Sequence, residues 1–427
     1  MTDTRATLAI DFGTSNSAAA ILAGGNVHRV PLEDWEETLP TAVFFPEGGG
    51  AMKIGAAAGA ALIGGDEGRY MRALKSVLGT SLFHEERLIA GKRRTLASIV
   101  TAFLVEVKSR AEALTRQSYS SAVSGRPVHF HTADPERDAK AAEDLAACYH
   151  AAGFTDLRFV LEPEAAALAS HGKGRAGELG LIVDIGGGTS DFTIYRHGEA
   201  GVDILSSHGI RLGGTDFDQA ISLAHAMPLL GHGGELKREF GPGLLPMPNA
   251  LYVDLATWAR IPFCYTPDTR RSVADMLKRA VDPVALGYLA PVALGYLAEL
   301  LEHELGHELA FAVEKGKIAA NGGDAMGRIN MAMIAPGLGT ALTPDDMAQA
   351  LAQHEAKLTD AITETLTRAD VTPDNISTVV LVGGSSLMGL VESVARRHCP
   401  TTVVERGEAF TAIVDGLALA IDRPIGT

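Results

Sequence analysis

One motif occurs twice in this chain and constrains its fold more than any other feature. An apolar run, an aspartate, glycine and two hydroxyl residues follow one another at 8–15 (Leu-Ala-Ile-Asp-Phe-Gly-Thr-Ser) and at 181–190 (Leu-Ile-Val-Asp-Ile-Gly-Gly-Gly-Thr-Ser). A second apolar run follows each copy, at 18–22 and at 192–195. Glycines between two apolar runs predict a strand, a tight turn and a returning strand. One copy near the start and one near the middle predict two lobes built on the same plan.

The two turns have the composition of a phosphate and magnesium site. Glycine N–H groups can approach phosphate oxygens closely because no Cβ obstructs them. Asp11 and Asp184 are expected at the strand ends, facing a common cleft, and paired carboxylates suit Mg²⁺. Thr14, Ser15 and Thr189 add hydroxyl donors. Two ordinary β-hairpins are the alternative, and the recurrence of the same residue order makes it the weaker one.

Strands and helices alternate through the first half of the chain. Apolar periodicity predicts a helix over 96–117, and alternation predicts a strand over 127–131. An aspartate followed by proline then begins a helix over about 135–152, and a strand over 156–161 leads into a helix from residue 163. Such alternation is typical of the α/β class.

The second half is predicted to be largely helical up to about residue 321. Within it the octapeptide Pro-Val-Ala-Leu-Gly-Tyr-Leu-Ala occurs at 283–290 and again at 291–298. Eight residues make about 2.2 helical turns, so a continuous helix would present the copies on different faces. A recent duplication and a locally broken helix are both compatible with the repeat. Further on, a helix from Pro344, a strand over 378–382 and a helix from about Met388 are expected.

Composition excludes several functional classes. The 427 residues carry a formal charge of −15, which disfavours nonspecific binding to nucleic acid. Cys148, Cys264 and Cys399 form no C-x-x-C pair, so neither a disulfide framework nor a thiolate zinc site is expected. The longest uncharged apolar run, 283–298, is shorter than the roughly 20 residues that span a bilayer. A cytoplasmic protein without a membrane segment is therefore expected.

The segment His303-Glu-Leu-Gly-His307 fits the H-E-x-x-H pattern of zinc proteases. Two imidazoles four residues apart on a helix would share one face. No third ligand is evident downstream, and the surrounding leucines favour a packed helix leading into Glu314. The packed helix is the preferred interpretation.

Six motifs occur in an order shared with one protein family. They are Asp11-Phe-Gly-Thr-Ser, Glu162-Pro163, Asp184-Ile-Gly-Gly-Gly-Thr-Ser-Asp191, Gly213-Gly-Thr-Asp-Phe-Asp218, Glu314-Lys-Gly-Lys317 and Val382-Gly-Gly-Ser385. Over roughly residues 7–421 this ordered set resembles the ATPase region of the DnaK-type, seventy-kilodalton heat-shock chaperones, within the actin-like ATPase superfamily. Shorter segments at 74–79, 125–128 and 227–231 resemble its YegD-like branch.

The resemblance implies an actin-like ATPase (ribonuclease H-like) fold with two lobes around a nucleotide cleft. Lobe I is expected over 1–178, with its core at about 1–40 and 120–178 and an inserted subdomain at about 41–119. Lobe II is expected over 179–427, with its core at about 179–222 and 322–427 and an inserted helical subdomain at about 223–321. No C-terminal substrate-binding domain is expected to follow.

The resemblance also implies ATP or ADP with Mg²⁺ as the bound cofactors. Asp11 and Asp184 would hold the Mg²⁺ through its waters, and Lys75 and Glu162 would approach the γ-phosphate and the attacking water. The implied catalytic residues are Asp11, Lys75, Glu162, Asp184, Thr189 and Asp191. The implied nucleotide contacts are Gly13, Thr14, Ser15, Gly186, Gly187, Gly188, Thr189, Gly213, Gly214, Glu314, Lys317, Asn321, Gly383, Gly384 and Ser385.

The function that follows is slow Mg-ATP hydrolysis as a conformational switch. It would act in protein folding or quality control through an unidentified protein client or co-chaperone, with no nucleic-acid or membrane partner. A small-molecule kinase of the same superfamily and a non-hydrolysing nucleotide-binding scaffold are the alternatives.

Overall fold

A computed structural model describes residues 6–33, 36–170, 174–199, 201–281, 290–322, 327–406 and 411–422. Within these ranges the chain forms two compact units. Unit 1 comprises Met1–Gly214 and Glu355–Thr427, and unit 2 comprises Thr215–His354. Among the described helices, none combines the length and hydrophobicity that crossing a membrane requires.

Unit 1 is built around two sheets with the same topology. The order β3-β2-β1-β10-β11 in the first sheet corresponds to β14-β13-β12-β19-β20 in the second, and corresponding neighbours pair in the same sense, parallel or antiparallel. The first sheet consists of β1 (Thr7–Phe12), β2 (Asn16–Ala23), β3 (Asn26–Val30), β10 (Ser121–Arg126) and β11 (Asp156–Leu161), with β4 (Leu39–Pro40) beside β2. The second consists of β12 (Leu179–Ile185), β13 (Ser190–His197), β14 (Val202–Ile210), β19 (Ile376–Val382) and β20 (Val403–Arg406). The predicted α/β fold with a duplicated plan is confirmed.

The two predicted hairpins, β1–β2 and β12–β13, are present. In the first, Asp11 lies opposite Ala18, and in the second Asp184 lies opposite Asp191. Both faces of these strands are buried, which explains their near-continuous apolar sequences. Each hairpin therefore carries its aspartates to the end of a buried strand.

The helices predicted in the first half form close to their expected bounds. They are α3 (Leu96–Thr115), α4 (Pro135–Ala151) and α5 (Glu162–Ala169). The side chain of Asp134 accepts a hydrogen bond from the N–H of Arg137 at 3.0 Å, which caps the start of α4. The predicted strand at 156–161 is β11.

The predicted strand at 127–131 is wrong. The strand β10 ends at Arg126, before Pro127. Beyond that point carboxylates, rather than a neighbouring strand, accept the backbone N–H groups. Val128 donates to Asp191 at 2.8 Å, and Phe130 donates to Asp138 at 2.6 Å.

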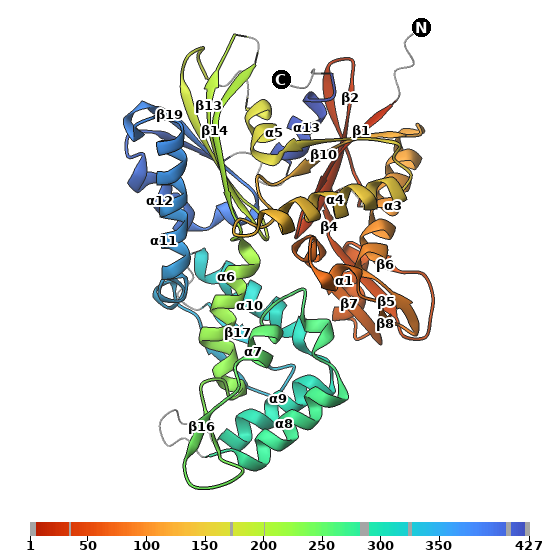
Figure 1. The fold of residues 1–427 in the computed structure, drawn as a ribbon, viewed down its shortest axis with the longest axis vertical. Coiled ribbons are helices and arrows are strands. Elements are labelled where there is room, and N and C mark those ends of the chain that lie inside the picture. Colours follow the sequence, from red (N-terminus) through yellow and green to blue (C-terminus); the bar gives the residue numbers. More distant parts are fainter. Residues whose placement is uncertain are drawn as a thin grey trace. The chain divides into compact units, whose positions relative to one another are not determined.

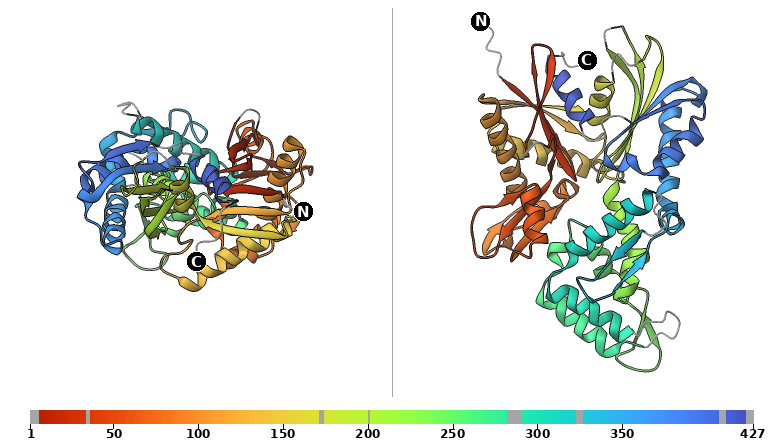
Figure 2. Two further views of the ribbon diagram at one scale, coloured as in Figure 1. Left: turned by 90° about the horizontal axis from the view of Figure 1, so that it is seen from above. Right: turned by 180° about the vertical axis from the view of Figure 1, so that it is seen from behind.

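Two small-residue helices lie between the sheets of unit 1, as Figures 1 and 2 show from opposite sides. They are α5 and α13 (Ala412–Leu419). Their alanine-rich faces share one buried core with residues of both sheets, including Ile182. The helices approach so closely that a methyl group added at Gly416 would come to 1.7 Å from the carbonyl oxygen of Ala165.

We expect Gly416→Ala to destabilise unit 1 by about 3 kcal/mol, because the added carbon meets backbone that cannot rotate away. The matched control is Gly59→Ala in α1 (Ala56–Ile63), where no atom lies within 4 Å of the new carbon. That substitution should stabilise the helix by about 0.5–1 kcal/mol. Thermal unfolding followed by circular dichroism measures both changes. Equal melting temperatures for the two variants would contradict this packing.

The remaining elements of unit 1 come from two stretches of the chain, residues 42–94 and residues 373–398. They are β5 (Ala42–Pro46), β6 (Lys53–Ile54), β7 (Gly68–Arg72), the 3-10 helix η1 (Leu74–Val77), α2 (Ser81–His84), β8 (Arg87–Ile89), β9 (Lys92–Arg94), η5 (Pro373–Asn375), η6 (Gly384–Leu387) and α12 (Gly389–His398). The helix α11 (Pro344–Arg368) begins in unit 2 and ends in unit 1. The predicted strand at 378–382 is part of β19, and the predicted helix from Met388 is α12.

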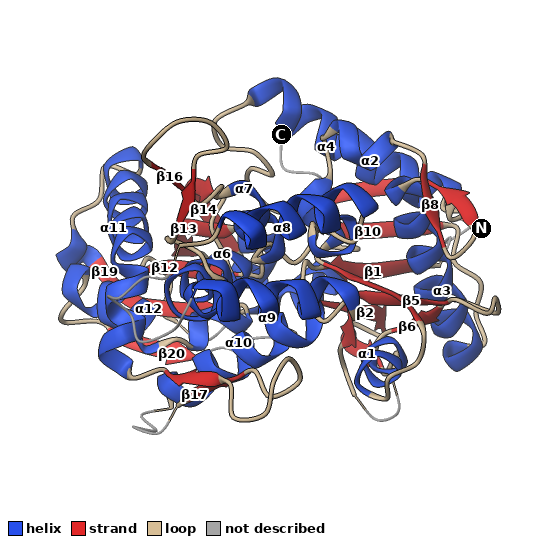
Figure 3. Ribbon diagram, turned by 90° about the horizontal axis from the view of Figure 1, so that it is seen from below, coloured by secondary structure: helices blue, strands red, loops and turns tan. Residues whose placement is uncertain are grey.

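Unit 2 is mainly helical, with short strands (Figure 3). Its elements are α6 (Gly214–Ile221), the π-helix η2 (Ser222–Ala226), η3 (Met227–Leu230), β15 (Glu235–Lys237), β16 (Leu244–Pro246), α7 (Ala250–Leu255), η4 (Ile261–Phe263), α8 (Pro267–Arg279), α9 (Ala290–Glu302), α10 (Gly306–Asn321), β17 (Arg328–Asn330) and β18 (Gly339–Ala341). The second octapeptide copy lies within α9, and the first copy, apart from Ala290, lies outside the described residues.

The predicted continuous helix through the H-E-x-x-H segment is wrong. The helix α9 ends at Glu302, α10 begins at Gly306, and Glu304 between them has a left-handed φ of 53°. The Tyr265 hydroxyl occupies the break, accepting from the N–H of Gly306 and donating to the carbonyl of Glu304, both at 3.0 Å. His303 therefore lies in the break and His307 in α10, so the two imidazoles do not share one helix face.

Candidate functional site

The tips of the β1–β2 and β12–β13 hairpins touch each other in unit 1. A methyl group added at Gly187 would lie 2.5 Å from the Ser15 hydroxyl and 3.0 Å from Cβ of Thr14. At Gly188 it would lie 3.2 Å from the Thr14 hydroxyl. Gly13 is equally constrained, because a methyl group there would meet the Asn16 carbonyl oxygen at 2.1 Å. The turns can approach this closely only because these positions are glycine.

Two more glycine segments reach the β12–β13 turn. The N–H of Gly214 donates to the carbonyl of Gly186 at 3.0 Å, and a methyl group at Gly213 would lie 2.5 Å from the nitrogen of Gly188. Gly383, which has a φ of 81°, would place a methyl group 2.7 Å from a carboxylate oxygen of Asp184. Gly384 follows at the start of η6, and Ser385 lies beside Gly214. Segments far apart in sequence thus converge behind this hairpin.

Four carboxylates are buried around these turns. Asp11 and Asp184 stand at the ends of β1 and β12, Asp191 lies opposite Asp184 on β13, and Glu162 is the first residue of α5. Each has a relative exposure of 8% or less. Glu162 has room because the neighbouring position is Gly125, where a methyl group would lie 3.1 Å from its Cγ. Asp191 accepts the N–H of Val128 at 2.8 Å.

Lys75 is the counter-charge to this group. Its Nζ donates to a carboxylate oxygen of Glu162 at 2.6 Å, and both side chains are buried. It belongs to η1, which begins after Ala73, a residue with a left-handed φ of 59°. A non-glycine residue in that region is uncommon and costs conformational energy. The strained turn carries Lys75 into the carboxylate group.

Burial, and after it the crowding of like charges, shifts the pKa values of these carboxylates. Burial raises the pKa of Asp11 to about 7, the charge of Glu162 adds to the rise, and Lys75 opposes it. Burial, followed by neighbouring carboxylates, also raises the pKa of Asp184 and of Asp191 well above the ordinary value. Burial alone would lower the pKa of Lys75, but Glu162 and Asp11 outweigh it and raise that pKa. The site holds more negative charge than its one buried lysine offsets.

We expect chelator-treated protein to lose stability as the pH rises from about 4 to about 7. The folded state binds more protons than the unfolded state in that window, because the pKa of Asp11 is raised on folding. Asp11→Asn removes the part of that loss that comes from Asp11 and should stabilise the metal-free protein by about 1–2 kcal/mol at pH 8, with little effect at pH 4.

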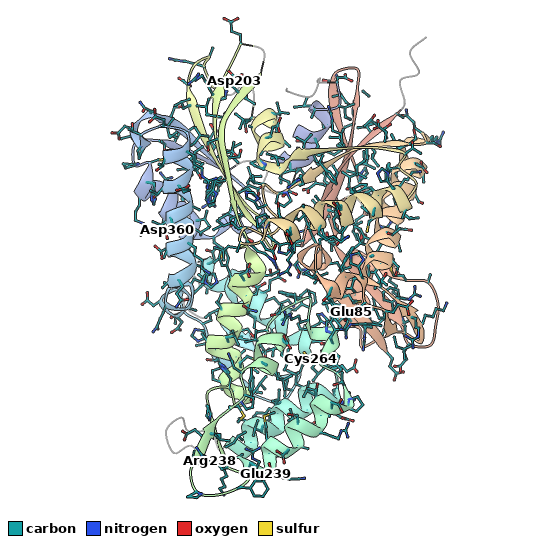
Figure 4. The ribbon with its side chains drawn as sticks, in the orientation of Figure 1. Glu85, Asp203, Arg238, Glu239, Cys264 and Asp360 are labelled. Atoms are coloured by element: carbon teal, nitrogen blue, oxygen red, sulfur yellow. The ribbon has the colours of Figure 1, made fainter. Side chains whose placement is uncertain are left out.

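Denaturant unfolding of both proteins at the two pH values measures the difference. Asp203→Asn is the control, since Asp203 is an exposed carboxyl on β14 (Figure 4). A stability difference between wild type and Asp11→Asn that stays constant with pH would contradict the raised pKa.

A small hollow, partly open to solvent, borders Lys75 and the two glycine turns. Among the predicted residues it is lined by Thr14, Lys75, Gly188 and Thr189. Three further lining residues, Ser76, Phe130 and Arg211, were not predicted as site residues. The available signals were the adjacency of Ser76 to Lys75 and the position of Arg211 two residues before Gly213.

Three predicted nucleotide contacts, Glu314, Lys317 and Asn321, lie on α10 in unit 2. There Lys317 is buried, and its Nζ lies 2.6 Å from a carboxylate oxygen of Asp218. The indole N–H of Trp258 donates to the other oxygen of Asp218 at 3.0 Å. Within unit 2, Lys317 therefore has a structural ion pair.

The acidic group fits a divalent cation held through intervening atoms. Among the described residues, no three His, Cys, Asp or Glu side chains gather closely enough to hold a metal ion directly. Yet the buried carboxylates raise one another's pKa values, so a nearby cation would relieve their repulsion. Mg²⁺ suits such a place because it usually keeps several of its waters. Asp11 and Asp184 are the residues that would hold it.

Known proteins match the part of the chain that contains both hairpins. The family model described as "Hsp70 protein" matches residues 7–228, which is 222 of 427 residues. The chaperone protein DnaK of Endomicrobium trichonymphae is 33% identical over 222 residues, covering 50% of this chain and 34% of the relative. The DnaK proteins of Methanothermobacter thermautotrophicus and Thermoplasma acidophilum are each 35% identical, covering 50% of this chain and 35% and 34% of the relatives.

The matched region thus spans about a third of the length of these curated relatives. It contains β1–β2, Lys75, Glu162 and β12–β13, the elements that build the acidic group. Because the family model covers more than half of the chain, this protein belongs to the Hsp70 family.

Proposed function

We propose that this protein binds ATP and ADP with Mg²⁺ at the paired hairpins and hydrolyses ATP slowly. The single observation that carries the proposal is the contact of the two glycine turns beside four buried carboxylates and one lysine. The turns offer backbone N–H groups and the Thr14, Ser15 and Thr189 hydroxyls to phosphates. Asp11 and Asp184 would hold the Mg²⁺ that accompanies the nucleotide.

Hydrolysis needs a positioned water and neutralised phosphate charge more than covalent chemistry. Lys75 is held by Glu162 and would offset charge that develops on the γ-phosphate. Glu162 and Asp191 would accept hydrogen bonds from the attacking water. Gly213, Gly214, Gly383, Gly384 and Ser385 would contact the nucleoside side of the ligand, together with Glu314, Lys317 and Asn321.

The bound nucleotide would act as a switch between conformations. Its phosphates would touch β1–β2 in lobe I (1–178) and β12–β13 in lobe II (179–427), which favours any state in which the turns lie close together. Differential contact of this kind is enough to shift a conformational equilibrium. We propose that a protein client or co-chaperone reads that state, in protein folding or quality control.

Phosphate release from Mg-ATP without any added acceptor tests this function. Wild-type protein should release phosphate slowly, and Glu162→Gln should still bind Mg-ADP while releasing phosphate more slowly. Release only in the presence of an added hydroxyl compound would instead support a small-molecule kinase. Nucleotide binding without any release would support a non-hydrolysing scaffold.

A further inference from the structure

We propose that Arg211 binds the terminal phosphate of the nucleotide as a second cation beside Lys75, so that the site discriminates a nucleoside triphosphate from a diphosphate. This inference rests on the function proposed above. Arg211 lines the same hollow as Lys75, Thr14 and Thr189. A phosphate placed against the two glycine turns would therefore have a guanidinium at the edge of its site.

The segment that carries Arg211 is fixed at several points. Its own N–H donates to the Thr132 hydroxyl at 3.0 Å, and the next residue's carbonyl accepts the Ser190 hydroxyl at 2.7 Å. Gly213 then packs against Gly188, and the N–H of Gly214 is bound to the β12–β13 turn. A backbone held this firmly fixes the point from which the arginine side chain extends, which limits where its guanidinium can reach.

Charge supplies the second reason for a further cation. Lys75 is already engaged with Glu162 at 2.6 Å, and three other carboxylates lie buried nearby. A triphosphate brings more negative charge to this region than a diphosphate does. Arg211 is exposed, unlike the buried Lys75, so a ligand in the hollow can reach its guanidinium.

An arginine also suits this position chemically. Its planar guanidinium can donate two parallel hydrogen bonds to phosphate oxygens, whereas a lysine acts as a point charge. The γ-phosphate has three oxygens at its free end and is the part that ADP lacks. Arg211 should therefore contribute to the binding of ATP far more than to the binding of ADP.

The test is calorimetric titration of the full chain with a non-hydrolysable ATP analogue and with ADP, both with Mg²⁺. Arg211→Ala should weaken binding of the ATP analogue by about 10-fold or more, as expected for the loss of a charge-assisted hydrogen bond. It should weaken binding of ADP by less than about 2-fold. Arg211→Lys should restore part of the loss. Arg137→Ala is the matched control, because Arg137 is also exposed and acts electrostatically on the same neighbour, His131, without lining the hollow.

The outcomes separate this inference from the proposed function. If Arg211→Ala binds both nucleotides as wild type does, or binds both equally more weakly, Arg211 does not select the terminal phosphate. The proposed nucleotide site is not contradicted by either result. Wild-type protein that binds neither nucleotide overturns the proposed function and this inference together. Selective loss of the ATP analogue, absent in Arg137→Ala, supports the inference.

Discussion

Asp11→Asn combined with Asp184→Asn should abolish Mg²⁺-dependent nucleotide binding. Both carboxylates are buried at the ends of corresponding strands, beside the touching turns. Each would act on the cation through its waters, and the loss of one such outer partner typically costs about 10–100-fold in metal affinity. Because the two groups interact, their losses need not multiply, and we expect a combined loss of about 100-fold or more. Titration with Mg-ADP measures it.

The control for this double variant is Asp360→Asn. Asp360 is an exposed carboxyl on α11 (Figure 4), so its removal makes the same chemical change far from the acidic group. The double variant should remain folded, since neutral side chains replace carboxylates that repel one another. Undiminished Mg-ADP affinity in a folded double variant would remove these residues from the site.

Lys75→Ala should slow ATP hydrolysis far more than it weakens ADP binding. We propose that the Lys75 ammonium offsets charge on the γ-phosphate, which ADP lacks. Because an interaction made only in the transition state changes the rate and not the affinity, ADP binding should be little affected. Removing one such group typically costs about 10²–10³ in rate. Single-turnover kinetics with Mg-ATP, alongside titration with Mg-ADP, separates the two effects.

Lys53→Ala provides the matched control for this variant. Lys53 also forms an ion pair, with Asp66 at 2.7 Å, but on the exposed surface of unit 1. Its removal should change neither rate nor binding. A Lys75→Ala protein that hydrolyses ATP normally while binding ADP poorly would place Lys75 outside the γ-phosphate site.

The hairpins and most helices of unit 1 could be predicted because their signals are local. In each copy of the repeat, a glycine turn lies between two apolar runs, so the neighbouring residues alone specify the hairpin. The start of α4 follows from Asp134 and Pro135, which act on their immediate neighbours. The repeat also predicts that the two sheets are built on the same plan.

The mistaken predictions all depend on partners that are distant in sequence. The sequence of 127–131 predicts a strand, but the N–H of Val128 donates to Asp191, more than sixty residues away, and the segment is a loop. The helix predicted through His303 is interrupted where the hydroxyl of Tyr265 bonds the backbone of Glu304 and Gly306. The local sequence gives no sign of this distant contact. The ion pair of Lys317 with Asp218 in unit 2 likewise joins residues far apart in sequence, and the predicted contact of Lys317 with a nucleotide stays a prediction.

The site itself was predicted through the ordered motifs, and its assignment to nucleotide stays a prediction. Motifs identified Asp11, Glu162 and Asp184, and the structure adds the reason that they lie together: glycine turns that touch. Arg211 escaped notice because a single arginine near a glycine pair has no distinctive pattern. Its place at the hollow emerges only from the fold.

Calorimetric titration of wild-type protein with ADP, in excess Mg²⁺ and again in chelator, measures whether the buried carboxylates and the glycine turns form a Mg²⁺-dependent nucleotide site. We expect saturable binding of one nucleotide per chain in Mg²⁺ and markedly weaker binding in chelator, because the buried carboxylates repel phosphate unless a cation lies between them. Absence of binding under both conditions, or equal affinity with and without Mg²⁺, would contradict this expectation.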